Sequence, residues 1–339
     1  MTTTQDMRIA VVGLGAVGGM LAARLALAPP GTARVAVLAR GATLAAVRDR
    51  GLVLREGGQE RIARLQAASD DARALGAQDL VIVAVKSQSL PELAPALAPL
   101  VGAHTVVLPA MNGVPWWFLQ ATGDARPLAS VDAQGHIAAA LALPQVLGGV
   151  IHFTCSSPAP GVVQHGFGER VIVGPASAGG VAVEGSAGVA RVLRAAGFTV
   201  EDSADIRRDI WFKLWGNMTM NPVSALTGAT CDLILDDPLV REFMLRAMEE
   251  AAAIGARIGC PIDQSGEARM AVTRQLGAFK TSMLQDAEAG RTLEIDAIVG
   301  AVHEIGARVG VATPAIGALL GLVRLMAGTR GLLPPVAAG

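Results

Sequence analysis

The stretch VVGLGAVGG at residues 11–19 decides the fold of the first half of the chain. Gly13, Gly15 and Gly18 have the spacing G-x-G-x-x-G, after an apolar strand-like run and at the start of a helical one. The first glycine permits a tight turn, the second lets a pyrophosphate approach the backbone, and the third lets the helix pack closely on the strand. The motif alone is weak evidence, but this context predicts a dinucleotide site. The residues predicted to form it are Gly13, Leu14, Gly15, Ala16, Val17 and Gly18.

Apolar runs of strand length alternate with helical segments around this motif. Continuous apolar runs of this kind are typical of parallel strands that are buried on both faces. We expect such strands at residues 8–13, 33–39, 79–85 and 104–110, and crossover helices at residues 16–28, 41–50 and 88–98. Two alternating runs around Gly57–Gly58 predict a hairpin over residues 52–65. Further strands are expected at residues 147–155, 161–165 and 170–174, and a loose surface connection at residues 175–188.

From about residue 205 the pattern becomes helical. The helical segments expected there are residues 206–227, 238–258, 265–288, 293–310 and 314–328. The sequence therefore predicts an α/β protein in which a Rossmann-type dinucleotide-binding domain, residues 1–204, precedes an all-helical C-terminal domain, residues 205–339. A chain of 339 residues agrees with two domains.

Charge and composition argue against several classes of partner. The net charge is −1 and no basic block occurs, so nothing indicates binding to nucleic acid or to an anionic membrane. No uninterrupted apolar stretch reaches the roughly 18–20 residues of a membrane span. The N-terminus lacks a signal-peptide pattern, and the three cysteines lie far apart without metal-ligand spacing. We expect a cytoplasmic protein with no structural metal.

The second predicted strand indicates which dinucleotide binds. NAD-binding chains usually carry an acidic residue near its end, where the carboxylate accepts from the ribose 2′-hydroxyl. No acidic residue occurs between Met20 and Arg48, and Arg40 ends the run VAVLAR. A guanidinium there can meet a 2′-phosphate in a charge-assisted contact, although it can also be a solvated loop residue. The sequence favours NADP(H).

Three further places carry polar groups beside apolar runs. Lys86 and Asn112 follow two of the predicted strands, where cofactor and substrate meet in this fold, although a solvated lysine or an ordinary turn explains them equally well. In KLWGNMTMN, residues 213–221, Lys213, Asn217 and Asn221 recur every four residues along one helix edge. Taken alone, that edge is read as a solvated stripe.

Five motifs together resemble the ketopantoate reductase (2-dehydropantoate 2-reductase) family over residues 8–324. The glycine motif is shared with many dehydrogenases, whereas the last two motifs are specific in order and spacing. The motifs are GLGAVGG at 13–19, VKSQ at 85–88, MNGVPWW at 111–117, KLWGNMTMNPVSALTG at 213–228 and KTSMLQDAEAGRTLEID at 280–296.

The resemblance implies NADPH-dependent reduction of a 2-oxo acid to its 2-hydroxy acid in pantothenate synthesis. It implies that Lys213 is the proton donor and that Asn112 and Glu294 lie at the junction of nicotinamide and substrate. It further assigns substrate contacts to Asn217, Asn221 and Ser282, and cofactor contacts to Arg40 and Lys86. The resemblance thus makes residues 1–204 an NADP-binding domain and residues 205–339 the domain that binds substrate and carries catalytic groups. Some members carry a substrate-binding asparagine ten residues after the position of Asn221, where this chain has Cys231.

The residues themselves agree with this chemistry. Hydride addition to a ketone places negative charge on oxygen, which needs a proton donor. The chain has no tyrosine, and none of its five histidines stands in a recognisable histidine–acid motif. Lys213 remains, in apolar surroundings that lower its pKa. A carboxylate at Glu294 is expected either to hold Lys213 protonated or to accept from the product hydroxyl.

Other functions stay open at this stage. The chain could reduce another small 2-oxo acid or an imine on the same fold, or bind a dinucleotide as a sensor without turnover. The oligomeric state is open as well, with a homodimer as one alternative.

Overall fold

The computed structural model describes residues 6–334; residues 1–5, within the N-terminal stretch that lacks a signal-peptide pattern, lie outside this range. By internal contacts the chain forms two compact units. Within the described residues, unit 1 comprises residues 6–111, 117–125 and 135–206, and unit 2 comprises residues 112–116, 126–134 and 207–334. The division into domains of residues 1–204 and 205–339 stays a prediction.

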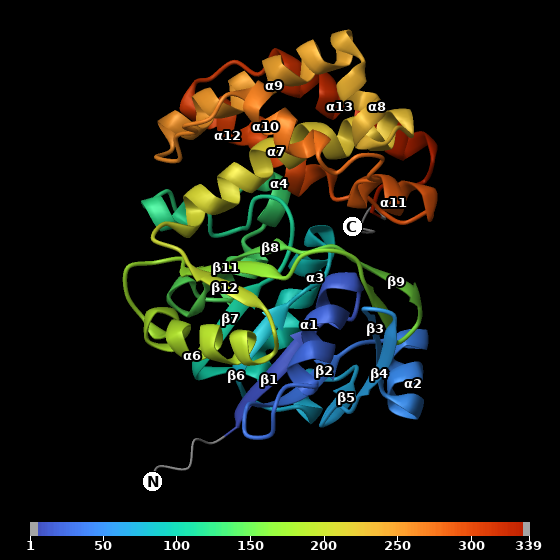
Figure 1. The fold of residues 1–339 in the computed structure, drawn as a ribbon. Helices are drawn as coiled ribbons and strands as arrows, with labels where there is room; N and C mark the ends of the chain where they lie inside the picture. Colours follow the sequence, from blue (N-terminus) through green and yellow to red (C-terminus); the bar gives the residue numbers. More distant parts are fainter. Residues whose placement is uncertain (1–5, 335–339) are drawn as a thin grey trace. The chain divides into compact units, whose positions relative to one another are not determined.

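A five-stranded sheet forms the centre of unit 1, and all of its neighbouring strands are parallel (Figure 1). Its order is β5 (Ala67–Ser69), β2 (Ala33–Leu38), β1 (Met7–Val12), β6 (Gln78–Val83) and β7 (Val101–Pro109). Ile9 pairs in register with Val35 on one side and Leu80 on the other, and all three are buried. The sheet confirms the predicted α/β fold, because its strands follow the continuous apolar runs.

Two helices of unit 1 differ from their predictions. The expected crossover helix at residues 88–98 is only α3 (Leu90–Leu93) followed by a 3₁₀ segment, Ala94–Leu100, because Pro95 and Pro99 cannot donate helical hydrogen bonds. The expected loose connection at residues 175–188 is wrong in its second half, which begins α6 (Val181–Ala195). Gly185 allows α6 to approach the sheet, since a Cβ there would lie 2.5 Å from the side chain of Val106.

Two smaller sheets complete the strands of unit 1. The predicted hairpin is confirmed as β3 (Leu52–Glu56) and β4 (Gln59–Ala63), and it joins β10 (Val162–His165) and β9 (Cys155–Ala159) in a four-stranded sheet. A three-stranded sheet contains β12 (Thr199–Asp202), β11 (Arg170–Pro175) and β8 (Leu147–His152). The remaining helices of this unit are α1 (Ala16–Ala26), α2 (Gly41–Arg50) and α5 (His136–Ala140).

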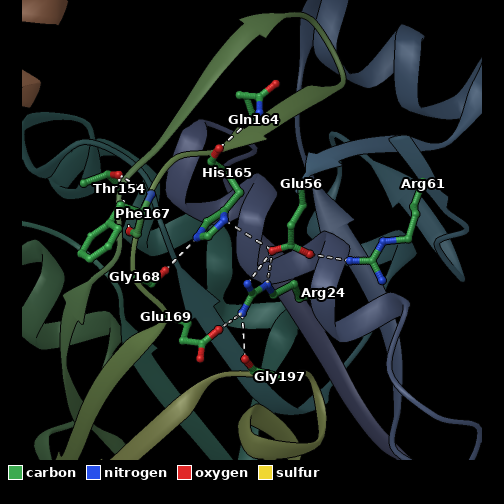
Figure 2. Close-up of polar contacts among 10 residues, drawn as sticks. All are labelled: Arg24, Glu56, Arg61, Thr154, Gln164, His165, Phe167, Gly168, Glu169 and Gly197. Atoms are coloured by element: carbon green, nitrogen blue, oxygen red, sulfur yellow. Dashed lines mark hydrogen bonds and ion pairs between the residues drawn. The ribbon is translucent and has the colours of Figure 1, made fainter. Parts of the chain in front are cut away.

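Helix α1, which follows the glycine motif, contacts both the parallel sheet and strands β3, β9 and β10. Near its C-terminal end Arg24 is buried, and Figure 2 shows its guanidinium between two carboxylates. Arg24 Nη2 lies 2.5 Å from Glu56 Oε1, Nη1 donates to Gly197 O at 2.8 Å, and Nη1 lies 3.8 Å from Glu169 Oε2. The same guanidinium stacks 4.9 Å from the centre of the Phe198 ring. This cluster fixes α1 against strands that are distant in sequence.

Unit 2 is built from helices, as the sequence predicts. They are α4 (Ala129–Asp132), α7 (Ile206–Thr227), α8 (Cys231–Asp236), α9 (Pro238–Arg257), α10 (Gly266–Arg274), α11 (Ser282–Glu288), a π-helical turn (Asp296–Gly300), α12 (Ala301–Val309) and α13 (Pro314–Thr329). The single helix expected over residues 265–288 is two helices, with Gly277 at a φ of 62° between them. None of the helices in residues 6–334 is long and apolar enough to cross a membrane.

Helix α7 is oriented by two tryptophans that pack on α9. Trp211 and Trp215 are 1% and 3% exposed, and their indole N–H groups donate to Ala251 O and Met248 O at 3.3 and 2.8 Å. At 100° per residue, Lys213 and Asn217 lie on nearly the opposite side of the helix. Packing of the tryptophans therefore turns the Lys213 edge away from α9.

Candidate active site

The glycine motif forms the turn between β1 and α1. Gly13 has a φ of 88°, and a Cβ at Gly18 would lie 1.9 Å from Gly13 O, so a side chain cannot be accommodated there. A Cβ at Gly15 would meet no atom within 4 Å. Gly15 is exposed and is the N-cap of α1, whose first turn contains no acidic residue. The turn thus presents backbone to solvent beside a helix N-terminus.

This geometry fits the pyrophosphate of a dinucleotide. Open space at the second glycine lets phosphate oxygens reach the backbone, and the amides of the first turn of α1 can donate to them. Leu14, Ala16 and Val17 are partly exposed around the turn, as a cofactor wall requires. The residues of the motif thus fit the group, and their individual contacts stay predictions.

Arg40 and Lys86 also lie beyond the carboxyl ends of strands of unit 1. Arg40 is the exposed N-cap residue of α2, two residues after β2 ends. The first turn of α2 contains no acidic residue, so its amides and Arg40 together favour an anion. Lys86 is partly exposed three residues after β6 ends, because that strand is shorter than the predicted run.

Asn112 is grouped with unit 2 because its neighbour packs on the π-helical turn. Gly113 has a φ of 87°, and a Cβ there would lie 2.5 Å from Ala297 O. Val114 N donates to the same carbonyl at 2.8 Å. π-Helical turns often occur at functional sites, and this one supplies a backbone acceptor that fixes the position of Asn112.

Lys213 is the centre of the polar cluster in unit 2. Its Nζ donates to Asn112 Oδ1 at 3.0 Å, and the Glu294 carboxylate acts on its charge. Burial lowers the pKa of Lys213 to about 8, and the negative charge of Glu294 limits that decrease. Glu294 immediately precedes the helix that contains the π-helical turn, where its carbonyl accepts from Ile298 N. The structure therefore brings together Lys213, Asn112 and Glu294, which are far apart in the sequence.

The reading of the Lys213 edge as a solvated stripe is wrong. Lys213 and Asn217 are partly buried and Asn221 is 6% exposed. Neither asparagine side chain hydrogen-bonds to the part of the chain that the structure describes. Their amides therefore remain available to a ligand at this edge.

Ser282 and Cys231 lie in different surroundings. Ser282 is exposed as the first residue of α11, directly after its N-cap Thr281. Cys231 is 1% exposed at the start of α8, and burial raises the pKa of its thiol to about 11. A buried, protonated thiol offers a substrate much less than the asparagine that some relatives carry there.

Two determinants of this cluster escape prediction from sequence. One is the contact of Gly113 with Ala297, which places Asn112. The other is Gly216, in the middle of α7, where a Cβ would lie 3.0 Å from Arg269 Nε. Glycine costs about 1 kcal/mol in a helix interior. A glycine in KLWGN is thus a signal that another element approaches closely.

The cluster can donate a proton to an anionic oxygen. An amine with a pKa of about 8 is largely protonated at neutral pH, yet is a stronger acid than an ordinary lysine. In the described residues, no group of three or more histidine, cysteine or carboxylate side chains is arranged to hold a metal ion.

Comparisons with known proteins agree with this arrangement. Two family models match, described as ketopantoate reductase PanE/ApbA at residues 9–178 and its C-terminal part at residues 205–327. The 2-dehydropantoate 2-reductase of Mesorhizobium japonicum is 42% identical over 96% of this chain and 99% of its own length. The 2-dehydropantoate 2-reductase of Halobacterium salinarum is 29% identical over 94% of this chain and 98% of its own length.

Solved structures show the same fold. A ketopantoate reductase candidate from Ralstonia solanacearum MolK2 has 57% identity and a TM-score of 0.89 over 96% of this chain and 99% of its own. D-mandelate dehydrogenase, solved with NADH and anilino(oxo)acetate, shares the fold at 21% identity and a TM-score of 0.82, over 96% and 100%. On the two family models and the M. japonicum relative, the chain belongs to the ketopantoate reductase family of oxidoreductases.

Proposed function

We propose that the protein catalyses the NADPH-dependent reduction of 2-dehydropantoate to pantoate, with Lys213 as the proton donor. The observation that carries the proposal is the contact of Lys213 with Asn112 beside Glu294, in a family whose members bear this name. Family membership favours an enzyme over a dinucleotide sensor without turnover.

The chemistry follows from the groups of unit 2. A bound dinucleotide would supply the hydride for carbon 2 of the 2-oxo acid, so the carbonyl oxygen needs a group that stabilises its negative charge. The Lys213 ammonium stabilises that oxygen and transfers a proton to it, which gives the 2-hydroxy acid and a neutral amine. Asn112 orients the ammonium through its Oδ1, and Glu294 keeps the amine protonated near neutral pH. Asn217, Asn221 and Ser282 are the proposed donors to the rest of the substrate.

The proposal names NADPH as the cofactor. Arg40 at the N-terminus of α2, with no acidic residue in the first turn, supports a 2′-phosphate rather than a ribose hydroxyl. Lys86 is a second proposed cofactor contact. A cytoplasmic location is also part of the proposal, as is a homodimer as one alternative for the assembly, which light scattering of the purified protein tests.

A second candidate is reduction of a different small 2-oxo acid, favoured by buried Cys231, which weakens recognition of the distal part of 2-dehydropantoate. One assay separates the two: NADPH oxidation by the full chain with 2-dehydropantoate, pyruvate, 2-oxoisovalerate and a cyclic imine. We expect 2-dehydropantoate to have the highest kcat/KM, by about tenfold or more. A higher value for another substrate would transfer the assignment to that compound.

A further inference from the structure

Arg269 of α10 lies against the backbone of α7, one turn from Lys213. A Cβ on Gly216 would lie 3.0 Å from its Nε and 3.1 Å from its Nη2, and its Cζ lies 5.6 Å from the centre of the Phe212 ring. Residues three apart are neighbours on a helix surface, so Gly216 adjoins Lys213 on α7. Gly216 therefore gives the guanidinium room beside the proposed proton donor.

The charge of Arg269 has no counter-ion in the described residues. It takes part in no ion pair, and its buried Nε has no hydrogen-bond partner. Burial lowers the pKa of Arg269. Gln264, just before the N-cap of α10, does not supply the missing acceptor, because its own Oε1 is also buried without a partner. A partly desolvated cation without a carboxylate is unfavourable unless an anion comes to it.

We propose that Arg269 binds the carboxylate of the substrate while Lys213 faces the keto oxygen. The inference rests on the proposed reduction of a 2-oxo acid and adds a residue that selects the acid group. In such a substrate the carboxylate is bonded to the keto carbon, so the groups that hold the two must be neighbours. Lys213 and Gly216, whose backbone the guanidinium covers, are one helical turn apart on α7. A guanidinium also presents a parallel pair of N–H donors that matches a carboxylate, whereas the two N–H groups of an amide diverge and a hydroxyl has one donor.

The test compares 2-dehydropantoate and 2-oxoisovalerate with their methyl esters, using the full-length Arg269→Met variant. We expect KM for the acids to rise at least about tenfold, with much smaller changes in kcat and in KM for NADPH. The preference for acid over ester in kcat/KM falls by a similar factor. Arg274→Met is the matched control, because Arg274 lies on the same helix but is half-exposed and paired with Asp236. Its kinetics should equal those of the wild type.

A purely structural role predicts another result. Arg269→Met would then lower the melting temperature and kcat while the acid-to-ester preference stayed at the wild-type value, which overturns the proposal. If this variant does not fold, ¹⁵N NMR of arginine side chains in the wild type shows whether Arg269 contacts the substrate carboxylate. The Nε signal of Arg269 should shift on addition of 2-dehydropantoate and not of its ester, and an unmoved signal at saturation refutes the contact. If 2-dehydropantoate shifts the Arg269 signal but is not reduced, the proposed function is refuted and the contact of Arg269 with the carboxylate stands.

Discussion

Arg24 in unit 1 and Arg269 in unit 2 are both shielded from solvent and both stack on a phenylalanine ring, yet they differ in their anions. Arg24 has Glu56 and Glu169 as well as a backbone carbonyl (Figure 2). Arg269 has no ion-pair partner in residues 6–334, and its Nε makes no hydrogen bond. The charge of Arg24 is neutralised by carboxylates of the fold, whereas neutralisation of Arg269 requires a ligand.

Lys213 belongs with Arg269 in this comparison. Its ammonium donates to the neutral amide of Asn112, and the charge of Glu294 only partly offsets the effect of burial on its pKa. Unit 2 thus places two desolvated cations, Lys213 and Arg269, at α7, whereas unit 1 surrounds its buried cation with anions. Perturbed charges of this kind are more typical of functional sites than of packing. Removal of the unit 2 cations should reduce activity, and disruption of the unit 1 cluster should reduce stability.

The largest expected effect is that of Lys213→Met on turnover. Without the proton donor, kcat should fall by roughly 10² or more, while the Kd for NADPH stays close to the wild-type value. The melting temperature should not fall, because the substitution removes a desolvated charge. Stopped-flow kinetics, fluorescence titration and thermal unfolding measure the three quantities. Lys280→Met is the control, since that lysine is half-exposed and paired with Glu288. A rise in KM alone would remove the proton-donor role from Lys213.

The titration of Lys213 predicts the pH dependence of the reaction. Reduction requires the protonated amine, whose fraction is nearly constant below its pKa of about 8 and falls about tenfold per pH unit well above it. The value of kcat/KM for reduction should therefore decline above about pH 8. A profile from about pH 6 to pH 10 measures this, and Lys213→Met should lack the inflection. A flat profile up to about pH 10 contradicts the assignment.

Glu56→Gln tests how much the ion pair of Arg24 with Glu56 stabilises unit 1. Loss of the carboxylate leaves Arg24 buried with only the distant Glu169, so the free energy of unfolding of unit 1 should fall by about 2 kcal/mol, with kcat little changed. Glu60→Gln in the same hairpin is the control, because Glu60 and Arg55 are about half exposed and their pair contributes roughly 0–1 kcal/mol. Urea unfolding measures the free energy of unfolding of both variants relative to the wild type. Equal effects of the two substitutions would show that the Arg24 cluster is no more important than a surface ion pair.

The sign of the pH dependence of this cluster follows from Glu56. Burial raises the pKa of its carboxyl, but the hydrogen bonds and charge of Arg24, with smaller effects of His165 and Arg61, lower it overall. A lowered pKa stabilises the fold above the pKa of the unfolded chain and less as pH falls through the folded value. The difference between wild type and Glu56→Gln should therefore stay constant above about pH 5 and shrink as pH falls below 4.5, the ordinary pKa of the carboxyl, toward the lower folded value.

The sequence predicts the parts of this molecule that depend on local patterns. The parallel strands follow from continuous apolar runs, the dinucleotide turn from glycine spacing, and α7 from helical periodicity. Helical periodicity places the polar edge of α7 correctly but suits a solvated stripe, and only the family motifs indicate that Lys213 and Asn221 do not face bulk water. The candidate residues were found largely through the specific motifs of a family.

What the sequence does not show depends on contacts between distant segments. Pro95 and Pro99 end α3 early, although the hydrophobic spacing there suits a helix. Asn112 follows a strand of unit 1 but packs with unit 2, because Gly113 touches Ala297. Arg269 stands in an ordinary helical stretch, and only the structure shows that residues 6–334 supply it with no counter-ion. Charge balance is a property of three-dimensional neighbours, which no linear pattern displays.

The smallest predicted effect concerns Arg40, an exposed cation of unit 1 whose proposed counter-ion is the 2′-phosphate. Arg40→Ala should raise KM for NADPH about tenfold and leave KM for NADH nearly unchanged, because NADH lacks that phosphate. The effect is modest since an exposed guanidinium is well solvated before binding. Arg48→Ala is the matched control, because Arg48 lies near the other end of α2 and donates to Ala68 O. The KM values for NADPH and for NADH should both stay unchanged in this variant. If Arg40→Ala weakens both cofactors equally, Arg40 does not contact the 2′-phosphate. The absence of a side-chain partner for Arg40 within residues 6–334 would then reflect only exposure to water. The inference that a cation without a counter-ion binds an anionic ligand would then apply to buried groups alone.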